Sequence, residues 1–226
     1  AGPAAVDVSR RAESARDDAV TRILLEALEA IPSAESRATA LGRLLPCGRT
    51  FVVDTGVFRY PWTVRDWALA ALGRIGDSEA VAELVAALDR PGVDSDAVAG
   101  MLGRLTAADP APDRPGAEAV AAWRDWWSQH RKERPSEWYR AALREYGVAD
   151  DGLPEGSGAA DVLERMASTD RHRLAATRLV KALTRGRVSR LPVDGIEPLP
   201  ALLRRAFGVA DAREDDPTGH DTDGPD

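Results

Sequence analysis

The hydrophobic positions along this chain follow a helical period. Between 63 and 76 they recur at intervals of three and four residues and form one stripe: Val64, Trp67, Ala68, Ala71, Leu72 and Ile75. Thr63 is placed to cap the start of this helix, and Gly76 to end it in the left-handed conformation. After Asp77 a second stripe follows, made of Val81, Leu84, Val85 and Leu88. So short a connection predicts an antiparallel helical hairpin over 62–90, whose apolar stripes need further neighbours to bury them.

The same pattern on either side of this hairpin predicts further helices. They cover 17–31, 33–45, 94–105, 117–130, 135–147, 159–168, 170–185 and 198–207. We expect this order along the chain: a flexible lead-in at 1–16, helical repeats over 17–149, a linker at 150–158, a C-terminal hairpin with a capping helix over 159–208, and a disordered acidic tail at 209–226.

The segment 46–61 interrupts the helical pattern. It gathers β-branched and aromatic residues around Gly56, which predicts an irregular or β-hairpin insertion. Insertions in repeat arrays emerge on one face, often the binding face. We therefore take four side chains of this segment as candidate partner contacts: Phe51, Asp54, Phe58 and Tyr60.

The stretch 62–90 resembles a HEAT-like repeat of the kind found in phycobilin-lyase-related proteins. The likeness is carried by Val64, Arg65, Ala68, Ala71, Leu72, Gly73, Ile75, Gly76, Asp77, Ala80, Val81, Leu84 and Leu88. The resemblance implies a helical solenoid used for binding, and it transfers no catalytic residue. The fold class we expect is all-α: a short right-handed α-solenoid of antiparallel helix pairs, interrupted near 46–61.

Charge narrows the classes of function. The formal net charge is -7, but seven acids and one base fall in 209–226, which leaves 29 basic and 30 acidic residues elsewhere. A neutral body disfavours nucleic acid as a partner, because a nucleic-acid binder needs a basic surface. Nearly all the bases are arginines, which indicates a GC-rich, bacterial genome more than a binding chemistry.

Cysteine and histidine usage gives no metal or cofactor site. The single cysteine, Cys47, excludes an internal disulfide, and the three histidines at 130, 172 and 220 lack ligand spacing. No apolar run reaches the ~18 residues that cross a bilayer. The chain begins at Ala1 instead of Met, so a cytoplasmic location and export after loss of a signal peptide both stay open.

The sequence 51–56 resembles the hydrophobic-Asp-Thr-Gly motif of aspartic proteases. That chemistry requires two carboxylates that share one proton, each held by such a loop. This chain has one copy of the motif in helical surroundings, so we expect Asp54 and Gly56 to form a turn.

Two further clusters are open to a structural and a functional interpretation. Four of the six tryptophans, Trp123, Trp126, Trp127 and Trp138, lie within sixteen residues. We expect them to fill the joint between helix pairs, with Trp126 as the candidate for an aromatic binding pocket.

A basic strip follows at Arg171, Arg178, Lys181 and Arg185. It is either a solvated face, an anion-binding surface, or the docking site of the acidic tail.

These observations favour a non-enzymatic scaffold that binds a protein or peptide partner. The alternatives are an accessory lyase-like protein, which the family resemblance suggests, and an anion- or nucleic-acid-binding helical-repeat protein. The sequence predicts no catalytic residue and gives no oligomeric state.

Overall fold

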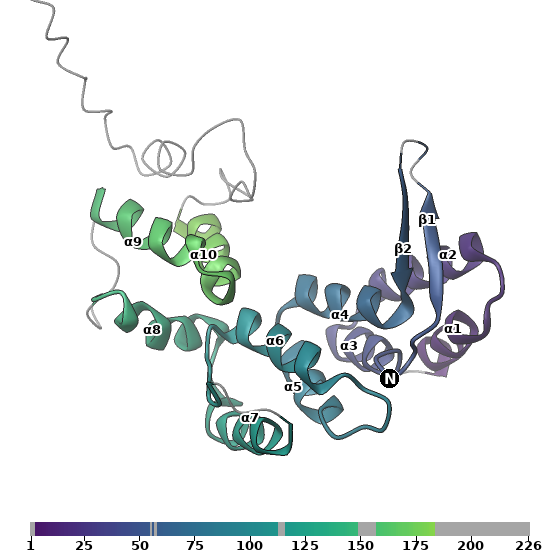
Figure 1. Ribbon diagram of the computed structural model, residues 1–226, viewed down its shortest axis with the longest axis horizontal. Helices are drawn as coiled ribbons and strands as arrows, with labels where there is room; N and C mark the ends of the chain where they lie inside the picture. Colours follow the sequence, from purple (N-terminus) through teal and green to yellow (C-terminus); the bar gives the residue numbers. More distant parts are fainter. Residues whose placement is uncertain (1–2, 55, 57, 113–115, 149–156, 184–226) are drawn as a thin grey trace, which may run out of the picture.

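The computed structural model of the chain (Figure 1) describes residues 3–54, 56, 58–112, 116–148 and 157–183. These residues are mostly helical, with one small antiparallel sheet. The helices are α1 (Pro3–Ser14), α2 (Asp18–Glu29), α3 (Ala34–Gly42), α4 (Val64–Ile75), α5 (Ser78–Ala87), α6 (Ser95–Thr106), α7 (Ala117–His130), α8 (Pro135–Glu145), α9 (Ser157–Ser168) and α10 (Asp170–Leu183). The strands are β1 (Thr50–Asp54) and β2 (Arg59–Thr63). None of the described helices is long and apolar enough to span a membrane.

The caps predicted around the central hairpin are confirmed. The Thr63 hydroxyl accepts the backbone N–H of Asp66 at 3.0 Å and starts α4. Gly76 ends α4 with φ +57°, a conformation that L side chains rarely adopt. Asp77 then caps α5 by accepting the N–H of Ala80 at 2.9 Å. Local sequence signals therefore determine where these two helices begin and end.

The prediction of a flexible lead-in at 1–16 is wrong, because residues 3–14 form α1, which packs against α2 and α3. Its buried positions are small residues: Ala5, Ser9 and Ala12. The Ser9 hydroxyl donates to the Ala40 carbonyl at 3.0 Å, and Arg49 donates to the Ala12 carbonyl at 2.7 Å. A helix that packs through small and polar groups shows no hydrophobic stripe, which explains why the pattern did not reveal it.

The core runs between helices through buried leucines and alanines, and α3 packs against both α4 and α5. At the α3–α5 contact Gly42 lies directly against the side chain of Glu83. Arg90 holds that carboxylate at 2.5 Å and also donates to the Gly42 carbonyl at 3.0 Å. Burial raises the pKa of Glu83 above its ordinary 4.5, an effect that Arg90 opposes. The pair of Glu83 and Arg90 therefore joins α5 to α3 at Gly42, a position where a larger residue would not fit.

The predicted insertion is a β-hairpin that projects beyond the helices (Figure 1), and its second strand extends to Thr63. The strands are antiparallel with Val52 opposite Pro61. The hairpin is attached at its base, because Val64 donates to the Arg49 carbonyl at 2.9 Å and Arg65 to that of Cys47 at 3.0 Å. It thus leads directly into α4.

The predicted C-terminal hairpin is present as α9 and α10, and α10 packs against α6. The Arg178 guanidinium reaches the end of α4, where it donates to the Gly76 carbonyl at 2.8 Å. It also donates to the Tyr139 hydroxyl of α8 at 2.8 Å. Three parts of the chain that are distant in sequence therefore meet at one side chain. Most of the expected linker, the capping helix and the acidic tail lie outside the described residues.

Candidate functional site

Four aromatic side chains follow one another from the tip of the β-hairpin to α4, as two pairs in ring contact, and we term them the aromatic ridge: Phe58, Tyr60, Trp62 and Trp67. Tyr60 and Trp62 share one face of β2, since alternate residues of a strand point the same way. Ring centroids lie 5.9 Å apart for Phe58 and Tyr60, and 5.7 Å apart for Trp62 and Trp67. Phe58 is 60% exposed and Tyr60 48%, which places the outer half of the ridge in solvent.

Both edges of the hairpin are blocked near their middle against the addition of another strand. On β1, the Val52 N–H points away from β2 and donates to the Asp18 carboxylate of α2 at 3.0 Å. On β2, the residue opposite Val52 is Pro61, which has no N–H to offer. The middle of the hairpin therefore presents side chains and not free strand edges, and the aromatic ridge is the apolar set among them.

Beside the inner half of the ridge lies a cavity of about 400 Å³, which we term the ridge pocket. It is lined by Glu26 and Glu29 of α2, Trp62 of β2, and Trp67 and Arg74 of α4. The ridge pocket was not predicted from the sequence. The available signal was the pair of tryptophans at 62 and 67, but the period assigned Trp67 to the core stripe of its helix.

One side of the ridge pocket is fixed by a compact polar cluster. The Glu29 carboxylate accepts the Trp67 indole N–H at 2.7 Å and Arg74 N–H groups at 2.6 and 3.2 Å. The Arg74 guanidinium also lies over the Trp67 ring, 6.0 Å from its centroid. The other acid, Glu26, makes only a looser ion pair with Arg22 at 3.5 Å within the described residues, and its side chain is 57% exposed.

The four candidates predicted on the insertion differ in their surroundings. Phe58 and Tyr60 are exposed as a contact surface requires. Phe51, by contrast, is 1% exposed and packs on Trp67 at 5.8 Å, so it supports the ridge from beneath and cannot touch a partner. Asp54 forms the expected turn, accepting the Gly56 N–H at 2.8 Å and lying 3.3 Å from Arg59.

Asp54 does share a shallow hollow with a second acid, Asp18. The hollow also contains Arg22 and Arg59. Asp18 is engaged by the Val52 N–H and Asp54 by its own turn, so each carboxylate has a separate donor. This is not the shared-proton arrangement of an aspartic protease.

Trp126 is surrounded by other aromatic rings. It stacks on His130 with centroids 4.6 Å apart and meets Trp123 and Trp138 edge-on at 5.6 and 5.8 Å. Trp123 and Trp138 are buried, and the Trp138 indole N–H donates to the His130 carbonyl at 3.4 Å. The cluster therefore joins α7 to α8, and Trp126 is a partly buried member of it.

The side chains of the predicted basic strip that the structure describes bind other groups of the protein. Arg171 pairs with Asp109 at 2.8 Å and with Glu145 at 3.1 Å, and Arg178 binds the end of α4. The side chain of Lys181 and the whole of Arg185 lie outside the described residues. Two of the four cations are therefore engaged with protein groups, which makes these two less available to an external anion.

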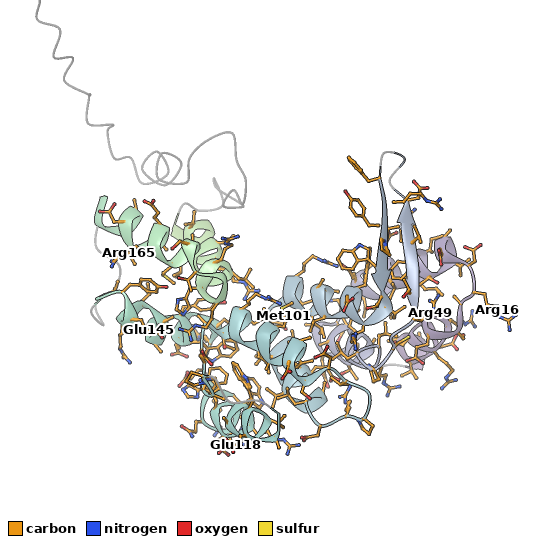
Figure 2. All side chains as sticks on the ribbon, in the orientation of Figure 1. Arg16, Arg49, Met101, Glu118, Glu145 and Arg165 are labelled. Carbon is orange, nitrogen blue, oxygen red and sulfur yellow. The ribbon has the colours of Figure 1, made fainter. Side chains whose placement is uncertain are left out.

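His172 is 1% exposed and forms part of a polar cluster between α8 and α10. Its Nδ1 lies 2.5 Å from the Tyr146 hydroxyl, and its Nε2 accepts the Arg171 Nε–H at 3.0 Å. Burial lowers the pKa of His172, and Arg171 lowers it further. Figure 2 places Glu145 on α8 and Arg165 between α9 and α8, where Arg165 donates to the Tyr146 carbonyl at 3.1 Å. Within the described residues no group of three or more His, Cys, Asp or Glu side chains is arranged to hold a metal ion.

Comparison with known proteins gives one result. Residues 64–90 match the family described as PBS lyase HEAT-like repeat, so α4 and α5 are similar to a HEAT-like repeat. The match ends before the tryptophan cluster of α7 and α8 and before the C-terminal hairpin. No curated protein and no solved structure matches the chain.

Proposed function

We propose that this protein is a non-enzymatic HEAT-like repeat scaffold that binds a protein or peptide partner, with the aromatic ridge as its contact surface. In this proposal the helix pairs form a short right-handed solenoid that holds the β-hairpin away from its body. The observation that carries the proposal is the exposure of Phe58 and Tyr60, which adjoin a pocket lined by two tryptophans. Aromatic anchors beside a pocket are typical of energetically dominant contacts in protein interfaces.

The hairpin supports this proposal better than the other surfaces considered. Exposed tyrosine and phenylalanine present a large apolar area at low cost in side-chain entropy. The blocked strand edges keep a hairpin of this kind from pairing with another strand, so a partner would meet side chains. Two cations of the basic strip, in contrast, are engaged: Arg171 by Asp109 and Glu145, and Arg178 by the end of α4.

The test compares two pairs of exposed apolar residues in the full chain. Phe58→Ser with Tyr60→Ser removes the outer ridge, and Val20→Ser with Ile23→Ser removes a similar exposed pair on α2, where Val20 is 46% and Ile23 59% exposed. Each protein serves as bait in quantitative affinity capture from the source cell. We expect specific partners to be lost from the ridge variant and kept by the α2 variant. Equal capture by both would refute the proposal.

The accessory-lyase alternative remains compatible with the description of the matched family. It predicts that the full chain binds an added tetrapyrrole and changes the absorbance spectrum of that tetrapyrrole. The scaffold proposal predicts an unchanged spectrum, so this measurement separates the two.

A further inference from the structure

The ridge pocket already binds one arginine side chain, that of Arg74. Its guanidinium pairs with a carboxylate, Glu29, and lies over an indole, Trp67. A planar guanidinium suits both contacts, since its N–H groups match the two carboxylate oxygens and its face stacks on an aromatic ring. The pocket thus shows from its own contacts which chemistry it accommodates.

The same two chemical groups occur a second time in the pocket. Glu26 precedes Glu29 on α2, and Trp62 lies edge-on to Trp67 with centroids 5.7 Å apart. These two are not held as the first pair is. The Trp67 indole N–H is bound to Glu29, whereas the Trp62 indole N–H makes no hydrogen bond to any residue that the structure describes. The ion pair of Glu26 with Arg22 lies on the surface, where such pairs are weak and readily exchanged.

The pocket can offer a carboxylate to an incoming cation. Its lining contains two carboxylates, Glu26 and Glu29, and one guanidinium, Arg74, and an incoming cation would exchange with Arg22 at Glu26. Its volume of about 400 Å³ leaves room for a side chain, and its lining is more apolar than polar. An attraction between a cation and an indole strengthens as water is excluded, and a bound peptide would exclude water from this partly open pocket.

We propose that Glu26 and Trp62 receive an arginine side chain from the partner peptide, alongside the resident set of Arg74, Glu29 and Trp67. The inference rests on the proposed function, because it names the chemistry of the partner that the aromatic ridge contacts. Apolar neighbours of that arginine would lie on the outer ridge, at Phe58 and Tyr60. The partner is thus a peptide segment with an arginine between apolar residues.

The test uses three acetylated tripeptide amides, Leu-Arg-Leu, Leu-Lys-Leu and Leu-citrulline-Leu, titrated into the full chain. Citrulline has the shape of arginine without its charge, and lysine has the charge without the planar group. Binding is followed by the six tryptophan indole N–H signals in NMR spectra, with that of Trp62 assigned through Trp62→Phe. We expect the arginine peptide to bind about tenfold more tightly than either of the others.

Glu26→Gln should abolish the preference for arginine, and Glu13→Gln, at an exposed acid of α1, should leave it unchanged. The fold should tolerate the first change because Glu26 is exposed and makes only a surface ion pair. Equal affinity for arginine and citrulline, equal affinity for arginine and lysine, or a preference that survives Glu26→Gln would each overturn the inference. Any of these results leaves the proposed function intact if the Phe58 and Tyr60 variant still loses its partners. If only the proposed function is wrong, the full chain should still prefer the arginine peptide, and the Phe58 and Tyr60 variant should capture the same partners as the unchanged protein.

Discussion

Replacement of Arg178 by methionine should undock the C-terminal hairpin from the HEAT-like repeat. The guanidinium donates to the Gly76 carbonyl and to the Tyr139 hydroxyl, both at 2.8 Å, with a longer contact to the Gly73 carbonyl at 3.4 Å. A hydrogen bond that involves a charged group contributes about 1.5–3 kcal/mol, and a cation at a helix C-terminus about 0.3–1 kcal/mol. Methionine keeps most of the apolar stem, so the change isolates these polar contacts.

These contributions are not independent, so their total is reduced. We expect the Arg178 variant to lose about 3 kcal/mol of the free energy that keeps the C-terminal hairpin docked. Hydrogen exchange measured by mass spectrometry is the suitable assay, since a repeat array need not unfold in one step. Amides of α10 should exchange on the order of 100-fold faster, because about 1.4 kcal/mol corresponds to a factor of ten. Amides of α1–α3 should exchange as before.

Two further variants bracket this result. Tyr139→Phe removes the hydroxyl that accepts from Arg178 and donates to the Leu105 carbonyl, so it should accelerate exchange in α10 by a smaller factor. Arg16→Met is the control, because Arg16 is exposed at the surface of the opposite end of the molecule (Figure 2). If α10 exchanges in the Arg178 variant as slowly as in the control, the docking role assigned to this side chain is wrong.

Two other predictions concern helix packing and pH. Gly42→Ala should destabilise the protein by about 1–3 kcal/mol, because its Cβ would overlap the Glu83 side chain that Arg90 holds in place. Gly100→Ala, where no atom lies within 4 Å of the added Cβ, should instead raise the melting temperature, and the same sign for both would contradict the packing argument. The pKa of His172 is lowered from 6.5, so the unfolded chain takes up a proton first as the pH falls, and the free energy of unfolding should fall below pH 6.5 by at most about 1.4 kcal/mol per pH unit. Urea unfolding from pH 7.5 to 5.5 should show a smaller decline for His172→Gln. The raised pKa of Glu83 acts in the opposite direction, but it is common to both proteins and cancels in their difference.

The elements that sequence analysis predicted well are those with strong local signals. Thr63, Gly76 and Asp77 determine the ends of α4 and α5 through hydrogen bonds that span three or four residues, so their roles are visible in the sequence. The β-hairpin was visible for a similar reason, since Gly56 and the β-branched residues around it leave the helical pattern. The helix α1 was missed because its packing depends on small residues and on Ser9 bonding to the distant Ala40 carbonyl.

The sequence by itself therefore determined the helical class, the repeat at 64–90 and the insertion, since each depends on neighbours within a turn or two of the chain. Only the tertiary structure decided which charged groups are bound within the protein and which remain available to a partner. Arg178 resembles a solvent-facing cation on its own helix, yet it binds a carbonyl 102 residues earlier. Glu29 and Trp67 become one cluster across 38 residues, and with them the ridge pocket forms. The physical reason is that a side chain's partners depend on which helices pack together, and helical periodicity alone does not encode that choice.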